Sequence, residues 1–166
     1  KWYWYLPLFL LMWGILIFVS WLVKKMPLIT GGGIPQTRGV INGRVAYKHP
    51  FIEVIAKFVG GILALSTGLS LGREGPSVQI GSYVGCLVSK WGRVLAGERK
   101  QLLAAGAGAG LAAAFAAPLA SSLLVIESIE RFDAPKTAIT TLLAGVVAGG
   151  VASWLFPINP YFQIDA

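Results

Sequence analysis

The sequence predicts an all-α polytopic membrane protein, built from several helices of unequal length. Three observations support this fold class. Hydrophobic residues make up 55% of the 166 residues, and charged residues only 13%. The mean hydropathy is +0.70, and several long runs carry no charge at all. A globular domain has about 25% charged residues, so the composition is that of an integral membrane protein. We expect residues 1–166 to form a single transmembrane domain.

The first predicted helix covers residues 2–23, which contain no charged side chain and are long enough to cross a bilayer. Aromatic residues stand at its start, as interfacial residues do: Trp2, Tyr3, Trp4 and Tyr5. Lys24 and Lys25 follow its other end, which predicts that this end faces the cytoplasm. The run is too long and too aromatic for a cleaved signal peptide. Considered alone, it is an ordinary membrane anchor.

Three glycines at residues 31–33, followed by Ile34 and Pro35, predict a loop that enters a short helix. Backbone N–H groups of such a loop can bind an anion, and no side chain stands in the way. The alternative is a plain connector. Gly39, Asn42 and Gly43 end the helix early.

The next hydrophobic helix is predicted over residues 51–71 and contains two charged residues, Glu53 and Lys57. They are four positions apart and therefore share a face of the helix. One interpretation is an ion pair between them. The other is that Lys57 places a positive charge near an anion path.

The segment Gly72-Arg-Glu-Gly-Pro-Ser77 places two opposite charges between long apolar runs. Gly75 and Pro76 predict the start of a new helix, with Arg73 and Glu74 just before it. A helix N-terminus presents free N–H groups and the positive end of the helix dipole, so it attracts anions. Glu74 is either a simple cap of this helix or a tethered anion in a functional site. The membrane setting favours the second reading.

The rest of the chain predicts further helices of mixed length. The helix after Gly75 should run to about Trp91, and residues 93–101 should form a polar connection. Residues 102–115 form an apolar helix in which Gly106 and Gly110 allow close packing. Ala117 and Pro118 then break the helix inside apolar sequence, which is tolerated in membranes where a helix end lines a cavity. We expect helices over 119–129 and 137–156, with a charged end between them: Glu127, Glu130, Arg131 and Asp133.

The net charge of +7 does not indicate nucleic-acid binding, because the basic residues form no face interleaved with aromatics. It fits positively charged cytoplasmic loops and a field that attracts anions. The only histidine, His49, has no nucleophile arranged beside it, and no residues have the spacing of metal ligands. We therefore expect neither a catalytic site, nor a metal, nor a cofactor. The single cysteine, Cys86, excludes an intramolecular disulfide.

Taken together, three motifs resemble the CLC family of voltage-gated chloride channels and chloride/proton exchangers. They are Gly31-Gly-Gly-Ile-Pro35, Gly72-Arg-Glu-Gly-Pro76, and Gly110-Leu-Ala-Ala-Ala-Phe with Ala117-Pro-Leu-Ala120 and Ile126-Glu127. The resemblance implies two inverted repeats of short, tilted and broken helices, a homodimer with one pore per subunit, and a multi-pass protein of the plasma membrane. The chain resembles most of the first repeat, so we expect it to be a fragment of a longer protein.

The resemblance also implies roles for single residues. Glu74 corresponds to the gating glutamate, which moves aside for the anion and accepts the external proton in exchangers. The backbone around Arg73, Glu74 and Gly75 corresponds to an outer anion site. Gly32, Gly33, Ile34 and Pro35 match the first anion-selectivity loop, in which the family often has a serine where this chain has Gly32. Lys57 matches a lysine of related members.

The internal proton position departs from the pattern of many exchangers. Ser128 stands where those proteins have a glutamate, and a serine hydroxyl does not titrate at physiological pH. Glu127, one position earlier, could substitute for it. We therefore expect gated chloride conduction, with proton-coupled exchange of chloride or another anion as the alternative. An intramembrane enzyme and a segment that transports nothing alone are further alternatives. If Glu74 gates the path, low external pH should increase conduction.

Overall fold

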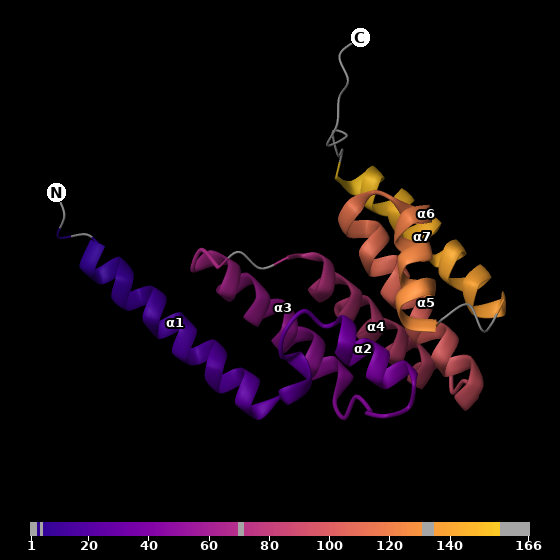
Figure 1. The fold of residues 1–166 in the computed structure, drawn as a ribbon, viewed down its shortest axis with the longest axis horizontal. Coiled ribbons are helices and arrows are strands. Elements are labelled where there is room, and N and C mark those ends of the chain that lie inside the picture. Colours follow the sequence, from indigo (N-terminus) through magenta and orange to yellow (C-terminus); the bar gives the residue numbers. More distant parts are fainter. Residues whose placement is uncertain (1–2, 4, 70–71, 131–134, 157–166) are drawn as a thin grey trace, which may run out of the picture.

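The computed structural model describes residues 3, 5–69, 72–130 and 135–156, and this part of the chain is helical without a strand, as predicted (Figure 1). The elements are α1 (Tyr5–Lys25), η2 (Pro27–Ile29), α2 (Ile34–Ile41), α3 (Pro50–Ser66), α4 (Glu74–Trp91), α5 (Ala96–Phe115), α6 (Pro118–Val125), η3 (Ile126–Glu130) and α7 (Pro135–Leu155). The predicted interfacial residues Trp2 and Trp4, the charged Arg131 and Asp133, and the predicted loop 157–166 lie outside the described residues.

Helices α1 and α7 are long and apolar enough to cross a membrane. Each has 21 residues, which gives a length of about 30 Å at 1.5 Å per residue. Helix α1 has no buried residue and extends away from the other helices in Figure 1, in contact with α3. Because an apolar helix with most of its surface exposed is unfavourable in water, this surface suits a lipid environment.

Several helix boundaries differ from the prediction: α1 runs to Lys25 rather than to residue 23, and α6 ends at Val125, where η3 follows, rather than at residue 129. Three further differences lie in α3, α4 and α5. Helix α3 ends at Ser66 rather than at residue 71, because Thr67 and Gly68 turn the chain and Gly68 has a φ of 80°. Helix α5 begins at Ala96, so the charged segment expected as a connection forms its first turns, with Glu98 near the positive end of the helix dipole. Helix α4 begins at Glu74 itself, and Arg73 is its N-cap.

Glycine contacts hold α4 and α5 together at close range. A side chain at Gly81 would overlap the Gly106 carbonyl, and one at Gly110 would overlap the Ser77 carbonyl. The prediction that Gly106 and Gly110 permit close packing is therefore confirmed, and the partner helix is α4. Small residues allow this approach of two backbones, which gives the pair its van der Waals contact in a bilayer.

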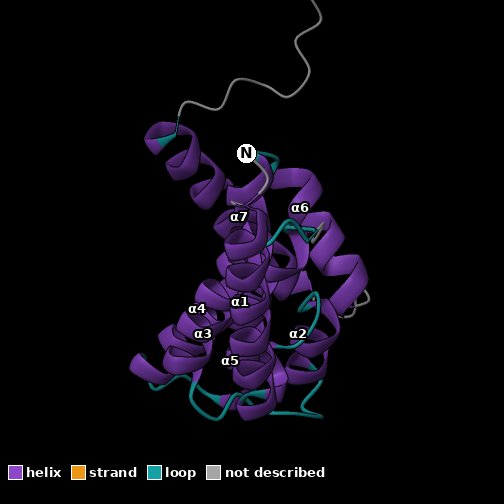
Figure 2. Cartoon of the chain, turned by 90° about the vertical axis from the view of Figure 1, so that its left-hand side faces the viewer, coloured by secondary structure: helices purple, strands orange, loops and turns teal. Residues whose placement is uncertain are grey.

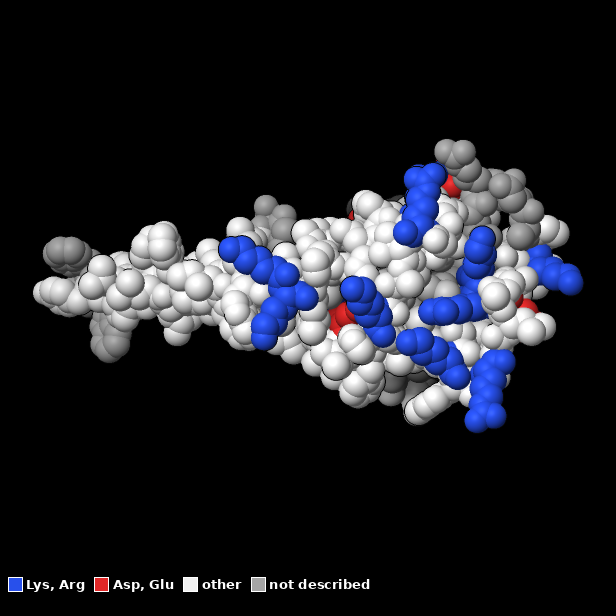
Figure 3. Space-filling view, turned by 90° about the horizontal axis from the view of Figure 1, so that it is seen from below, with Lys and Arg blue, Asp and Glu red and all other residues white. Residues whose placement is uncertain are grey.

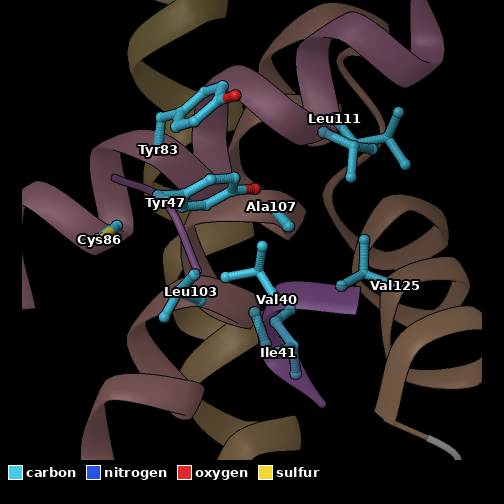
Figure 4. Close-up of a cluster of buried hydrophobic side chains, with 11 residues drawn as sticks. Val40, Ile41, Tyr47, Tyr83, Cys86, Leu103, Ala107, Leu111 and Val125 are labelled. Atoms are coloured by element: carbon cyan, nitrogen blue, oxygen red, sulfur yellow. The ribbon is translucent and has the colours of Figure 1, made fainter. Parts of the chain in front are cut away.

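The buried core lies where α2, α4, α5 and α6 meet (Figure 4). Tyr83 and Cys86 come from α4, and Leu103 and Leu111 come from α5; all four are at most 3% exposed. Figure 2 shows the helices packed side by side around this region. This core fixes the positions of the helix beginnings described below.

Basic side chains gather on the underside of the molecule (Figure 3). The end of α1, the loop between α2 and α3, and the loop between α4 and α5 all lie on this side of Figure 1. Their exposed basic residues are Lys24, Lys25, Arg44, Lys48, Lys90, Arg93 and Lys100. A membrane protein carries such an excess of basic residues on its cytoplasmic loops. The other basic residues lie on the same side as Lys24 and Lys25 (Figure 1), the side that the sequence predicts to face the cytoplasm.

Candidate functional site

The structure brings two of the sequence motifs together at the start of α4. Glu74 is the first residue of this helix and is exposed, while Gly75 is buried. A side chain at Gly75 would overlap the carbonyl of Gly32, so the two backbones touch directly. The residues expected to form two anion sites therefore meet in one place.

A hollow of about 420 Å³ is lined by Ile34 and Glu74, the neighbours in sequence of Gly33 and Gly75. Its lining is mostly apolar and consists of Ile34, Glu74, Leu111, Phe115, Ala117, Ala120, Ser121, Leu124 and Ser128. Three residues singled out from the sequence, Ile34, Glu74 and Ser128, thus line one cavity. Glu127 is exposed and is not part of the lining. Arg73 lies at the rim, with its guanidinium carbon 5.5 Å from the centre of the Phe115 ring.

Three helices begin at this hollow. Ile34 is the first residue of α2, Glu74 is the first residue of α4, and Ala117 is the N-cap of α6. No side chain caps any of these three N-termini within the described residues. Each end contributes roughly 0.3–1 kcal/mol toward a nearby negative charge. Three of them together supply about 1–3 kcal/mol, equivalent to about a five- to 150-fold gain in anion affinity. The arrangement can hold an anion without a full countercharge.

Side chains donate hydrogen bonds to the backbone carbonyl groups of the loop before α2. Lys57 Nζ donates to the carbonyls of Ile29 and Gly31, at 2.8 and 2.7 Å. Gln79 Nε2 donates to the Leu28 carbonyl at 2.7 Å, and Gln36 Nε2 donates to the Thr30 carbonyl at 2.7 Å. Four consecutive carbonyls, residues 28–31, are therefore bound by side chains.

These four hydrogen bonds hold the negative ends of the peptide groups in place. A bound carbonyl cannot rotate freely, so the peptide groups before Gly32 keep one orientation and the start of α2 stays in place. Sequence reasoning identified Lys57 but missed Gln36 and Gln79. The only signal for Gln79 was an uncharged polar residue within a largely apolar helix, because its partner Leu28 is 51 residues away.

The ion pair between Glu53 and Lys57, one of the two interpretations of their spacing, does not form among the described residues. Lys57 is buried and donates to the loop carbonyls, while Glu53 accepts a hydrogen bond from the His49 backbone N–H at 3.2 Å. The i, i+4 spacing placed both residues on one face of α3, but the loop carbonyls are the nearer partners for the ammonium group. Lys57 thus lies directly behind the glycine loop.

Gly32 and Gly33 have different surroundings. No atom lies within 4 Å of the position that a Cβ would take at Gly32. At Gly33, with a φ of 90°, a Cβ would lie 2.7 Å from the Gln79 side chain and 2.8 Å from the Gly75 carbonyl oxygen. A side chain therefore fits at position 32 but not at position 33.

Known proteins resemble this chain in sequence and in fold. The chain is 38% identical over 154 residues to the H(+)/Cl(-) exchange transporter ClcA of Vibrio cholerae, an alignment that covers 89% of this chain and 33% of the relative. It is also 38% identical over 154 residues to the H(+)/Cl(-) exchange transporter ClcA of Citrobacter koseri, with 90% of this chain and 32% of the relative covered. The chain thus spans about a third of the length of these relatives.

A solved structure supports the same assignment. The crystal structure of a slow cyanobacterial Cl⁻/H⁺ antiporter matches 91% of this chain and 36% of its own chain, with a TM-score of 0.82 and 30% sequence identity. The family model described as voltage gated chloride channel matches residues 15–166. Together with the helix beginnings at the hollow, these matches show that the chain belongs to the voltage gated chloride channel family of membrane transport proteins.

Proposed function

We propose that the protein exchanges chloride, or a similar small anion, for protons across a membrane, with Glu74 as the gate. The observation that carries this proposal is the hollow at which three helices begin and into which Glu74 extends. A carboxylate at such a place occupies the position that suits a free anion, so the two compete. When Glu74 is protonated it loses its charge and releases the position to the anion.

Proton-coupled exchange is preferred to passive conduction, although the sequence analysis placed conduction first. The two ClcA relatives are named for proton/chloride exchange, and the structural neighbour is a Cl⁻/H⁺ antiporter. Passive conduction remains the second candidate because Ser128, which lines the hollow, carries no titratable group. No anion other than chloride is named for these relatives, so chloride is the first anion to test.

We expect the protein to work in the plasma membrane as a homodimer. The outer faces of α6 and α7 are apolar and exposed in a single chain, and Leu119, Leu123, Ile139 and Leu143 are each more than half exposed. Lipid or a second protein surface must cover them in the membrane.

The test is to measure anion and proton movement together, with the full-length protein in liposomes under a chloride gradient. We expect chloride efflux accompanied by opposing proton movement. In Glu74→Gln the proton movement should be lost and the chloride flux should no longer depend on external pH, because the amide cannot titrate. Chloride flux without protons in the wild type would support passive conduction instead. An absence of anion flux from well-folded wild-type protein would refute the transport function.

A further inference from the structure

A buried carboxylate outside the hollow has no role in the site described above. Glu53 lies in the first turn of α3 and is 6% exposed. Its Oε1 accepts the hydrogen bond from the His49 N–H, whereas its Oε2 is buried and has no hydrogen-bond partner among the described residues. An ionised carboxylate is costly to bury in this way, and a protonated one much less so. A buried ionisable residue in a membrane protein is by default a functional one.

The groups around Glu53 leave its charge uncompensated. Tyr83 of α4 and Tyr47 of the preceding loop are buried and lie within electrostatic range of Glu53, but neither carries a positive charge. Lys57 lies one turn further along α3, and its Nζ donates to the carbonyls of Ile29 and Gly31 instead. Cys86 of α4 lies near Tyr47 and accepts a hydrogen bond from Arg99 Nη2 at 3.4 Å. No described Lys, Arg or His side chain forms an ion pair with Glu53.

Polar side chains continue from Glu53 toward the glycine loop. Tyr83 is fully buried, and its hydroxyl accepts a hydrogen bond from Gln79 Nε2 at 3.3 Å. The Tyr47 ring packs against it, with ring centres 4.1 Å apart, as Figure 4 shows. Gln79 in turn lies against Gly33 and binds the Leu28 carbonyl. Gly33 also lies close to the Gly75 carbonyl, and Glu74 is the residue before Gly75.

Glu53 lies close to the basic underside of the molecule. His49 and Lys48, which precede α3, are exposed there, and Glu53 is one helical turn further in. Proton exchange needs a titratable group on each side of the anion site. Glu74 supplies one of them at the hollow, and Ser128 cannot supply the other.

We propose that Glu53 is the internal proton acceptor of the exchange, in the place of Ser128. A proton from the cytoplasmic solution binds to the free Oε2, which leaves a neutral carboxyl group in a buried position. The proton later leaves Oε2 as the carboxylate is restored, and Glu74 is its final acceptor on the way out. The Tyr83 hydroxyl, which can both donate and accept, is the first polar group on this route. This inference rests on the proposed exchange function.

The test uses the full-length protein in liposomes and records chloride and proton fluxes together. Glu53→Gln keeps an oxygen that can accept from the His49 N–H, so the start of α3 is preserved. We expect it to retain chloride flux and to lose at least nine-tenths of the proton flux, roughly a tenfold decrease. Glu98→Gln is the matched control, because Glu98 also lies in the first turn of a helix on the basic side but is exposed. It should behave as the wild type does.

Two further variants separate the possible outcomes. Tyr83→Phe removes only a hydroxyl and should slow proton flux several-fold more than it slows chloride flux. This variant tests the inference even if Glu53→Gln does not fold. Glu127→Gln tests the rival acceptor. An unchanged ratio of protons to chloride in Glu53→Gln, or loss of proton flux in Glu127→Gln alone, would overturn the inference while leaving exchange intact. A wild type that moves chloride without protons would overturn both proposals.

Discussion

A comparison of two neighbouring glycines tests whether the glycine loop is held against α4 as the structure shows. In Gly33→Ala the new methyl group would lie 2.7 Å from the Cβ and Oε1 atoms of Gln79 and 2.8 Å from the Gly75 carbonyl oxygen. Carbon atoms in ordinary contact are about 3.5–4.0 Å apart, so one neighbour must move by roughly 1 Å. In Gly32→Ala the methyl group meets no atom within 4 Å.

The expected loss of stability has two parts. A φ of 90° at residue 33 costs a residue with a side chain about 1–2 kcal/mol. Overpacking of a close contact costs about 1–3 kcal/mol more. Gly33→Ala should therefore lose about 2–5 kcal/mol of folding free energy. Gly32 carries neither cost, so Gly32→Ala should be as stable as the wild type.

The assay is thermal unfolding of the full-length variants in detergent, with chloride affinity measured on the same samples by calorimetry. We expect a clearly lower melting temperature for Gly33→Ala. Its chloride affinity should also fall, because displacement of Gln79 releases the Leu28 carbonyl. Equal melting temperatures for the two alanine variants would refute the close packing of Gly33, Gln79 and Gly75 on which the site is built.

Two other predictions concern the same loop. Lys57→Met leaves the carbonyls of Ile29, which is buried, and of Gly31 without their donor. An unsatisfied buried group costs about 1–3 kcal/mol, so the loop should be held less firmly and calorimetry should show weaker chloride binding. Lys90→Met, at an exposed position in the last turn of α4, should not change the affinity. Equal affinities in both variants would argue against the role of Lys57 behind the loop. Gly32→Ser fits the open space at position 32 and adds a hydroxyl donor, so the preference for chloride over nitrate should rise by about tenfold, the equivalent of one net hydrogen bond. Competition flux measurements in liposomes check this, and an unchanged preference would show that the hydroxyl does not reach the anion.

Much of the local structure could be predicted from the sequence, because local physics determines it. Uncharged apolar runs define α1 and α7, and Pro118 and the glycines at 31–33 mark where α6 and α2 begin. The motif around Glu74 also indicated a helix beginning exposed to an anion. Boundaries were less accurate: α5 starts earlier than expected because charged residues such as Glu98 suit the first turn of a helix.

The partners of the polar residues depended on the tertiary structure. From spacing alone, Lys57 pairs with Glu53, but the folded chain brings the carbonyl of Ile29, 28 residues away, to the ammonium group instead. Gln79 meets Leu28 across 51 residues, and the hollow unites Ile34, Glu74 and Ser128 from three separate segments. The sequence by itself determined that this protein is helical, membrane-embedded and equipped with helix beginnings that can attract an anion, because hydropathy and glycine or proline placement act over a few neighbouring residues. Only the tertiary structure decided which beginnings converge and which carboxylate is left buried and unpaired, because those properties depend on the packing of helices far apart in the chain.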